Sequence, residues 1–271
     1  MPKEKVMQLL KTDRVYFDGK PDVYLEAFAI VGDNRPKKSA MLIIPGGGYH
    51  HVCLTYEGES VALSYVSQGV NAFVLNYRAE ICDVFPSHLE YAAWAMAYIK
   101  DHAEEFDVDP ERVFALGFSA GGHLCASLAV MHKIAEKNLG YPENYAKPRG
   151  TVLCYPVVSA YSPTHEGSFA NLLNKPFSEL SDEERRKFSI ECNVTSETPP
   201  AFIWHTAEDT AVPPIGSLHL AEAYLSAGVP VTMHLYPYGA HGIGLATESS
   251  GVSQPIAKMW FSYSLEWMKT V

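Results

Sequence analysis

The features that this sequence lacks exclude several classes of protein. No Cys-x-x-Cys pair is present, and the five cysteines are widely spaced, at Cys53, Cys82, Cys125, Cys154 and Cys192. Disulfide frameworks and zinc motifs use closer, paired spacings, so free buried thiols in a reducing compartment are expected. No other motif in the sequence indicates a metal or a cofactor.

Membrane and secretion signals are also missing. No apolar run reaches the length that is needed to cross a bilayer. Residues 1–5 carry charge, but the apolar segment that a signal peptide requires does not follow them. These observations predict a cytoplasmic protein without a membrane partner.

Positive charge is scarce. The 271 residues include 21 Lys and Arg against 31 Asp and Glu, which gives a formal net charge of −10. Because the average surface is negative, it repels nucleic acid and anionic lipid, and a small-molecule partner is expected instead. Hydrophobic residues make up 47%, enough for the core of one large α/β domain over 1–271. A homo-oligomer is compatible with this composition.

Apolar runs alternate with amphipathic segments from residue 40 onward. Strands are predicted over 40–44, 70–75, 112–117, 150–155, 201–204 and 231–236, and helices near 57–68, 86–103, 119 onward, 214–227 and 253–269. An earlier strand over 22–31 is expected at an edge of the sheet. This alternation predicts an α/β fold with a mainly parallel central sheet and helices on both faces.

The region 160–200 interrupts this rhythm. Pro, Asn and Ser accumulate there, and Ser181 and Glu184 have the spacing of a capping box, which predicts a short helix over 181–188. We expect this region to be a lid-like insertion over the edge of the sheet. It contains no long amphipathic helix of the kind that shields a lipid-binding tunnel.

One short stretch organises the rest of the chain. The strand over 112–117 is followed by a Gly- and Ala-rich helix, with Ser119 at the turn in the pattern Gly117-x-Ser119-x-Gly121. Small residues are needed on both sides because the two backbones approach closely. Such a turn exposes the serine hydroxyl above the sheet edge beside the amide of Ala120. An ordinary strand–helix turn is the alternative, and the position of the motif favours a nucleophile.

A serine hydroxyl is a weak nucleophile, so Ser119 requires a base and a group that orients the base. Among 11 histidines, His241 stands out because it lies in a glycine-rich loop after the strand over 231–236. Parallel sheets bind ligands at the carboxyl ends of their strands, which places this loop at the same edge as Ser119. His123 lies one turn into the helix and is expected to be a packed structural residue. His241 is the predicted base.

The orienting acid is expected in a loop between these two residues in the chain. The loop after the strand over 201–204 contains two adjacent carboxylates, Glu208 and Asp209. Asp209 lies farther from the strand end, directly before the turn residues, and is the predicted acid. Alternatively, either carboxylate caps the helix that follows.

The tetrahedral oxyanion of acyl transfer requires preorganised N–H donors. Ala120 supplies one amide, and residues 45–49, Pro-Gly-Gly-Gly-Tyr, follow the strand over 40–44. Consecutive glycines allow successive N–H groups to converge on one point. A phosphate-binding loop would require Lys-Ser/Thr after the glycines or a Gly-x-Gly-x-x-Gly pattern, and neither is present. The pattern therefore predicts an oxyanion hole.

These motifs resemble the α/β-hydrolase superfamily, and more narrowly the bacterial esterase/lipase group related to acetyl esterases and acetyl-xylan esterases. The resembling segments are 44–49, 117–123, 204–209 and 239–242. The resemblance implies a catalytic triad of Ser119, Asp209 and His241, with oxyanion donors at Gly47, Gly48 and Ala120. Many lipase-like relatives have histidine where this chain has Pro45.

Three functions are compatible with these residues. The leading hypothesis is a carboxylic ester hydrolase that removes short acyl groups, especially acetyl, from a small or carbohydrate substrate. The same triad serves an amide hydrolase, such as an arylformamidase or a small peptidase. A non-catalytic binding module is disfavoured because all three triad residue types are present in order.

Aromatic residues near the expected mouth bear on substrate size. Such side chains either stack on sugar or aryl rings of a substrate or pack in the core. For each residue taken singly, packing in the core is the simpler interpretation; the residues are Tyr49, Tyr155, Tyr161 and Phe169. Together with the short insertion, they predict a small acyl pocket.

Overall fold

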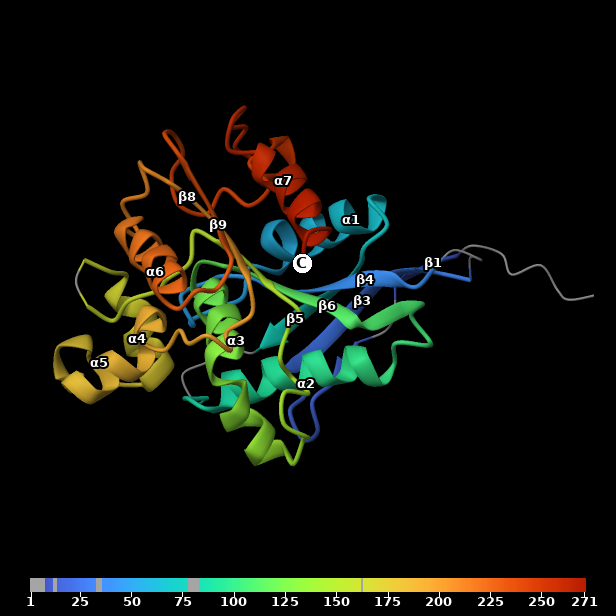
Figure 1. Cartoon of the computed structure of the whole chain (residues 1–271), viewed down its shortest axis with the longest axis horizontal. Coiled ribbons are helices and arrows are strands. Elements are labelled where there is room, and N and C mark those ends of the chain that lie inside the picture. The colour runs from blue at the N-terminus through green and yellow to red at the C-terminus, as the bar shows by residue number, and fades with distance from the viewer. Residues whose placement is uncertain (1–7, 12–13, 33–35, 78–82, 162) are drawn as a thin grey trace, which may run out of the picture.

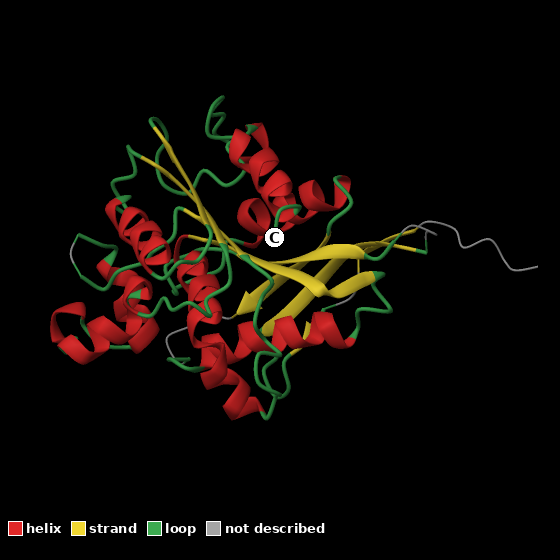
Figure 2. Ribbon diagram, viewed as in Figure 1, coloured by secondary structure: helices red, strands yellow, loops and turns green. Residues whose placement is uncertain are grey.

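A central sheet dominates the computed structural model, which describes residues 8–11, 14–32, 36–77, 83–161 and 163–271 (Figures 1 and 2). Within these residues the sheet has nine strands in the order β1-β3-β5-β4-β6-β7-β8-β9, and β2 also pairs with β3. The strands are β1 (Gln8–Lys11), β2 (Val15–Tyr16), β3 (Val23–Val31), β4 (Lys38–Ile44), β5 (Asn71–Tyr77), β6 (Val108–Phe118), β7 (Thr151–Cys154), β8 (Ala201–Thr206) and β9 (Val231–Tyr236).

Along the part of the sheet that runs β5-β4-β6-β7-β8-β9, every pair of neighbouring strands is parallel, which confirms the predicted sheet. Their carboxyl ends therefore share one edge, and the loops after β4, β6, β8 and β9 meet there. Strand β3 is antiparallel to β5. The predicted edge position of β3 is wrong, because the short strands β1 and β2 pair along its outer side and β3 is mostly buried.

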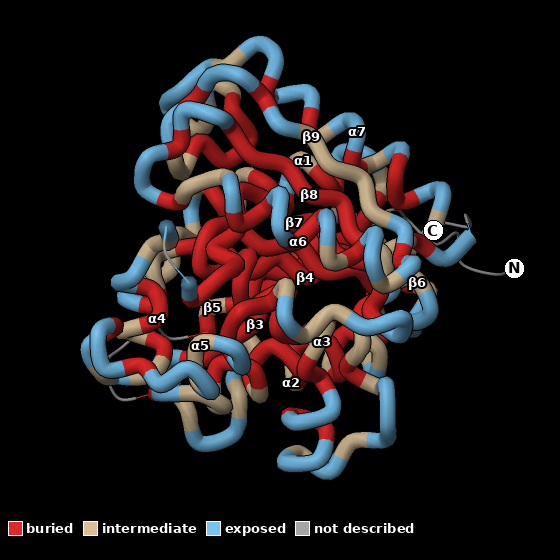
Figure 3. Tube along the Cα trace, turned by 60° about the vertical axis from the view of Figure 1, so that its left-hand side comes forward, coloured by how far each residue is buried: buried red, intermediate tan, exposed pale blue. Residues whose placement is uncertain are grey.

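Helices cover both faces of the sheet, as predicted, and enclose two apolar layers (Figures 1 and 3). Side chains of α1 (Ser60–Ser67) and α7 (Met259–Met268) pack in one layer. Side chains of α2 (Ser87–Asp101), α3 (Ser119–Leu139) and α6 (Ile215–Ser226) pack in the other. The strands between the layers are apolar on both faces, which is why their sequences are continuous apolar runs.

Two helix boundaries differ from the prediction. The turn before α1 is π-helical over Leu54–Glu59. Helix α7 begins at Met259, later than the predicted residue 253, because residues 255–258 form turns after Pro255. Proline at 255 has no N–H to donate and restricts the residue before it.

The region 160–200 carries two short helices, α4 (Glu166–Leu173) and α5 (Asp182–Phe188). The helix α5 begins at the predicted capping box, in which the Ser181 hydroxyl accepts from the Glu184 amide and the Glu184 carboxylate accepts from the Ser181 amide. Helix α4 was not predicted. The single domain over 1–271 with a lid-like insertion stays a prediction.

Candidate active site

The turn that carries Ser119 joins β6 to α3 directly. Ser119 has a φ of 53°, a conformation that costs about 1–2 kcal/mol for a residue with a side chain. A Cβ atom at Gly117 would lie 2.2 Å from the carbonyl oxygen of Gly121, and one at Gly121 would lie 2.2 Å from the carbonyl oxygen of Ile44. The predicted need for small residues on both sides of the serine is confirmed.

A chain of hydrogen bonds connects the three predicted triad residues. The Ser119 hydroxyl lies 2.8 Å from His241 Nε2, and His241 Nδ1 donates to Asp209 Oδ2 at 2.6 Å. The loops after β6, β9 and β8 supply these residues in turn, so three distant segments meet at the carboxyl edge of the sheet. The ring of Tyr155 packs edge-on against the His241 imidazole, with the centroids 5.1 Å apart.

Asp209 is buried and accepts four hydrogen bonds. Its Oδ1 accepts from the amides of Ala211 and Val212, and its Oδ2 accepts from His205 Nε2 at 3.1 Å as well as from His241. Burial opposes ionisation, but the hydrogen bonds from the two histidines outweigh it and lower the pKa of Asp209 well below its ordinary range. Asp209 is therefore a carboxylate at any pH near neutrality.

The neighbouring carboxylate has a separate place. Glu208 Oε2 accepts from the amide of Gly239 at 3.0 Å, in the loop that carries His241. It does not reach the imidazole through any hydrogen bond in the described residues. Both carboxylates thus hold the histidine loop, but only Asp209 contacts the ring.

The glycine loop after β4 leaves two of its amides without a partner in the part of the chain that the structure describes. The Gly46 carbonyl accepts from the Cys53 amide at 3.0 Å, and the Gly47 carbonyl accepts from the amides of His50 and His51 at 3.0 and 3.1 Å. Because a trans peptide places N–H opposite C=O, these bonds turn the N–H groups of Gly47 and Gly48 away from the anchored side. Within the described residues, neither amide donates a hydrogen bond to the protein.

Positive φ values make glycine necessary in this loop. Gly47 has a φ of 131° and Gly48 a φ of 65°. A Cβ atom on Gly47 would lie 2.0 Å from the carbonyl oxygen of His51. The third predicted donor, Ala120, is in the first turn of α3, where amides have no partner inside the helix.

A buried carboxylate, Glu57, lies behind this loop. Its Oε2 accepts from the Gly46 amide at 2.8 Å and its Oε1 accepts from the Tyr155 hydroxyl at 2.7 Å. The same hydroxyl accepts from the Gly244 amide at 2.9 Å. Burial raises the pKa of Glu57, and the two hydrogen bonds oppose that rise. This network connects the glycine loop to the loop of His241.

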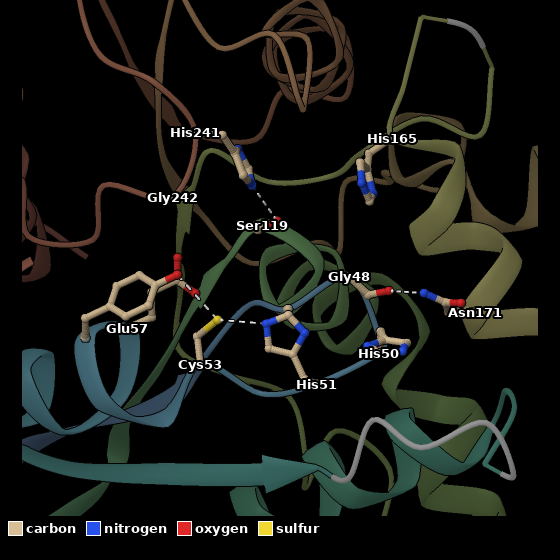
Figure 4. Close-up of a pocket in the computed structure, with 12 residues that line it drawn as sticks. Gly48, His50, His51, Cys53, Glu57, Ser119, His165, Asn171, His241 and Gly242 are labelled. Carbon is tan, nitrogen blue, oxygen red and sulfur yellow. Dashed lines mark hydrogen bonds between the residues drawn. The ribbon is translucent and has the colours of Figure 1, made fainter.

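Helix α4 of the insertion borders the site. Asn171 Nδ2 donates to the carbonyl oxygen of Gly48 at 2.8 Å. His165, at the N-cap of the same helix, faces the cavity near Gly48 (Figure 4). The predicted insertion therefore contributes side chains to the site.

Ser119 opens into a cavity of about 360 Å³. None of the residues that line it has an aliphatic side chain: they are Gly47, Gly48, His50, His51, Cys53, Tyr56, Glu57, Ser119, His165, Asn171, His241 and Gly242 (Figure 4). Imidazole, phenol, thiol, hydroxyl, amide and carboxylate side chains form the wall together with glycine backbone. Such a wall offers hydrogen bonds to a ligand.

The aromatic residues expected near the mouth do not line this cavity. Tyr49, Tyr155 and Phe169 are almost fully buried and pack in the core, and Tyr161 is exposed. The interpretation that these side chains stack on a substrate ring is therefore wrong for the three buried residues. Their rings are packed under the loops, because burying an apolar ring is more favourable than exposing it at the mouth.

The predicted structural role of His123 is confirmed. Its Nδ1 lies 2.9 Å from the Tyr49 hydroxyl and its Nε2 lies 2.9 Å from the Phe188 carbonyl oxygen. Burial lowers the pKa of His123 to about 4.

Sequence reasoning did not predict a role at this site for four residues: Glu57, His165, Asn171 and His205. The partners of Glu57 and Asn171 lie far away in the chain, and His165 caps helix α4, which was not predicted. His205 had one signal, because it precedes Asp209 by four residues at a strand end. Among the described residues, no group of three or more His, Cys, Asp or Glu side chains is placed to hold a metal ion.

The parallel sheet, the strained serine turn and the loops at its edge define an α/β-hydrolase fold. More narrowly, the chain belongs to the BD-FAE family, whose model matches residues 28–224. Family and fold confirm the resemblance that the motifs indicated.

Known relatives agree with this assignment. An endo-1,4-beta-xylanase B of Butyrivibrio fibrisolvens is 37% identical over 225 residues, which cover 82% of this chain and 35% of the xylanase. An acetylxylan esterase of Xylanibacter ruminicola is 29% identical over 84% of this chain and 43% of that protein. The chain thus spans less than half the length of these two curated relatives.

A solved structure covers nearly the whole chain. The acetyl ester-xyloside bifunctional hydrolase of Caldicellulosiruptor lactoaceticus has a TM-score of 0.80 to this chain at 31% identity. The match covers 98% of this chain and 96% of that one.

Proposed function

We propose that this protein is a serine ester hydrolase that removes short acyl groups, above all acetyl, from a carbohydrate substrate. The observation that carries the proposal is the continuous hydrogen-bonded chain from the Ser119 hydroxyl through His241 to Asp209. In this chain each residue has the partner that its role requires.

The reaction begins when Ser119 Oγ attacks the acyl carbon and His241 Nε2 takes its proton. Asp209, ionised and fixed by four hydrogen bonds, holds His241 in the tautomer that accepts this proton and stabilises the resulting imidazolium. The amides of Gly47, Gly48 and Ala120 donate to the oxyanion of the tetrahedral intermediate. Each such donor is worth about 3–4 kcal/mol.

The intermediate collapses when His241 donates its proton to the leaving alcohol oxygen, which leaves an acyl group on Ser119. Water then attacks the acyl carbon, with His241 as the general base, and a second oxyanion forms in the same hole. Return of the proton to Ser119 releases the carboxylic acid.

The substrate class rests on the cavity and on the relatives. A wall without aliphatic side chains offers hydrogen bonds to the hydroxyl groups of a saccharide, and a volume of about 360 Å³ suits a small ligand. The curated relatives are named a xylanase and an acetylxylan esterase, and the solved one an acetyl ester-xyloside hydrolase. These names support an acetylated xylose-containing saccharide.

A cytoplasmic location is also proposed. The described cysteines, Cys53, Cys125, Cys154 and Cys192, are free thiols, which supports a cytoplasmic location, whereas Cys82 lies outside the described residues. Among the described residues, no helix combines the length and apolarity needed to cross a membrane.

Covalent labelling tests the nucleophile. A fluorophosphonate reagent is expected to label the wild-type protein once, and Ser119→Ala is expected to abolish both this label and the hydrolysis of 4-nitrophenyl acetate. Mass spectrometry locates the label. A label on another residue, or unchanged hydrolysis by the variant, contradicts the proposal.

A further inference from the structure

The cavity contains a second histidine that the proposed reaction does not use. His165 lies across Ser119 from His241, and its imidazole points into the cavity (Figure 4). The side chain is half-buried and belongs to the N-cap residue of α4. A Cβ atom built on Gly48 would lie 3.7 Å from His165 Cε1, so the ring borders the glycine loop.

The partners of His165 determine its tautomer. Nδ1 accepts from the backbone amide of Ser168 at 3.2 Å and lies 2.8 Å from the Ser168 hydroxyl. Because an amide N–H only donates, Nδ1 carries no proton, and in the neutral ring the proton is on Nε2. Burial, and then the proximity of His241, lower the pKa of His165, so the ring is neutral at neutral pH.

Nε2–H has no hydrogen-bond acceptor among the described residues. A half-buried N–H donor beside the nucleophile is therefore held in a fixed direction by Ser168 and left available to a ligand. Asn171, on the same helix, fixes the Gly48 carbonyl and so keeps α4 against the glycine loop.

The direction of the reaction decides which part of the substrate reaches His165. The leaving oxygen must lie next to His241 Nε2 to receive its proton, so the alcohol part departs on that side. The oxyanion occupies the hole at the glycine loop. The acyl substituent then extends away from His241, toward the wall formed by His165.

We propose that His165 is a substrate-binding residue of the acyl site, where Nε2–H donates to an acceptor oxygen on a short acyl group. This inference rests on the ester hydrolysis proposed above and extends the range of its acyl groups beyond acetyl. The ring limits the length of the acyl group and favours short chains that carry an ether or hydroxyl oxygen close to the carbonyl, as in alkoxyacetyl and hydroxyacyl esters.

Two variants separate the role of His165 Nδ1, which caps α4, from the proposed role of Nε2–H, which donates to the substrate. His165→Asn keeps an acceptor at the position of Nδ1, so it still caps α4, but it has no group at the position of Nε2. His165→Gln places an amide N–H near the position of Nε2 and loses the cap acceptor. Thermal unfolding checks that each variant folds, and His165→Asn is expected to unfold near the wild-type temperature.

Two esters with the same leaving group provide the readout. 4-Nitrophenyl methoxyacetate and 4-nitrophenyl butyrate have acyl groups of nearly equal size, and an ether oxygen in the first replaces a methylene in the second. The ratio of their kcat/KM values is compared between proteins, so that their different intrinsic reactivities cancel.

We expect His165→Asn to lower the methoxyacetate-to-butyrate ratio about tenfold, the loss of one hydrogen bond, and His165→Gln to keep it within about threefold of wild type. An unchanged ratio in His165→Asn overturns the inference. If the ratio is unchanged because kcat/KM falls equally for both esters, Nε2–H donates to the oxyanion instead. Failure of the proposed function looks different: the wild-type protein would hydrolyse neither ester and would take no label at Ser119.

Discussion

At the scale of single residues, the two adjacent carboxylates after β8 make different contacts and should respond differently to the same substitution. Asp209→Asn places an amide N–H against His241 Nδ1 and favours the wrong imidazole tautomer, so kcat is expected to fall by about 10⁴. Stopped-flow or steady-state hydrolysis of 4-nitrophenyl acetate measures this change.

Glu208→Gln is the matched control. The glutamine keeps an oxygen that accepts from the Gly239 amide, so kcat is expected to stay within about threefold of wild type. The opposite result, a large loss in Glu208→Gln and a small one in Asp209→Asn, would reverse the assignment of the acid.

The ionisation of Asp209 also determines the pH dependence. The pKa of Asp209 is lowered in the folded protein. The negative charge therefore contributes its full stabilisation above the ordinary aspartate pKa, and this stabilisation is lost only as pH falls through the lower pKa of the folded state. Asp209 therefore stays ionised through the range near pH 6–7.5 in which histidines titrate.

Activity is expected to rise with pH on the acid side, because His241 must be neutral to accept the proton of Ser119. The log of kcat/KM against pH should have a slope near 1 on the acid side and level off in alkali. A profile that is flat from about pH 5 to 8 while chemistry limits turnover would exclude a histidine base.

At the scale of elements, the contact between α3 and the loop after β4 depends on one glycine. Replacing a helical glycine by alanine ordinarily stabilises a helix by about 1 kcal/mol. At Gly121 the new Cβ atom would meet the backbone oxygens of Ile44 and Pro45 at 2.2 Å, and backbone atoms cannot move aside without displacing β4.

Gly121→Ala is therefore expected to destabilise the protein by about 2–3 kcal/mol and to abolish activity, since Ser119 and the glycine loop are displaced together. Chemical denaturation and ester hydrolysis measure the two effects. Gly140→Ala is the control: a Cβ there meets nothing within 4 Å, and only its φ of 74° opposes the change, at about 1 kcal/mol with activity retained. Wild-type stability in Gly121→Ala would show that the helix and loop are not in tight contact.

At the scale of the whole molecule, the region 160–200 borders the cavity at the sheet edge. Helix α4 contributes His165 and Asn171 to a cavity of about 360 Å³ that has no aliphatic wall. Each methylene of an acyl chain gains about 0.8 kcal/mol only where it is buried, and a cavity of this volume leaves the methylenes of a longer chain in water.

We therefore expect kcat/KM to decrease steadily along the 4-nitrophenyl esters from acetate through butyrate to octanoate. The shared leaving group makes the acyl chain the only variable. A preference for octanoate over acetate would contradict the small acyl pocket and the carbohydrate substrate together.

The sequence by itself determined the parallel strands of the sheet and the positions of the predicted triad. Continuous apolar runs mark strands that are buried on both faces, and the Gly-x-Ser-x-Gly turn is a local steric requirement that can be read from five consecutive residues. In a parallel sheet the loops after all strands meet at one edge, so chain order alone brought Ser119, Asp209 and His241 to the same place.

Only the tertiary structure decided the surroundings of these residues, because those contacts join segments that are far apart in the chain. Glu57 reaches Tyr155 across 98 positions and Asn171 reaches Gly48 across 123. Neither pair has a spacing that a sequence pattern records. The interior position of β3 likewise depends on pairing with β1 and β2, and the burial of Tyr49 and Tyr155 depends on which loops cover them. Local chemistry thus specified the nucleophile, and long-range packing specified which side chains line its cavity.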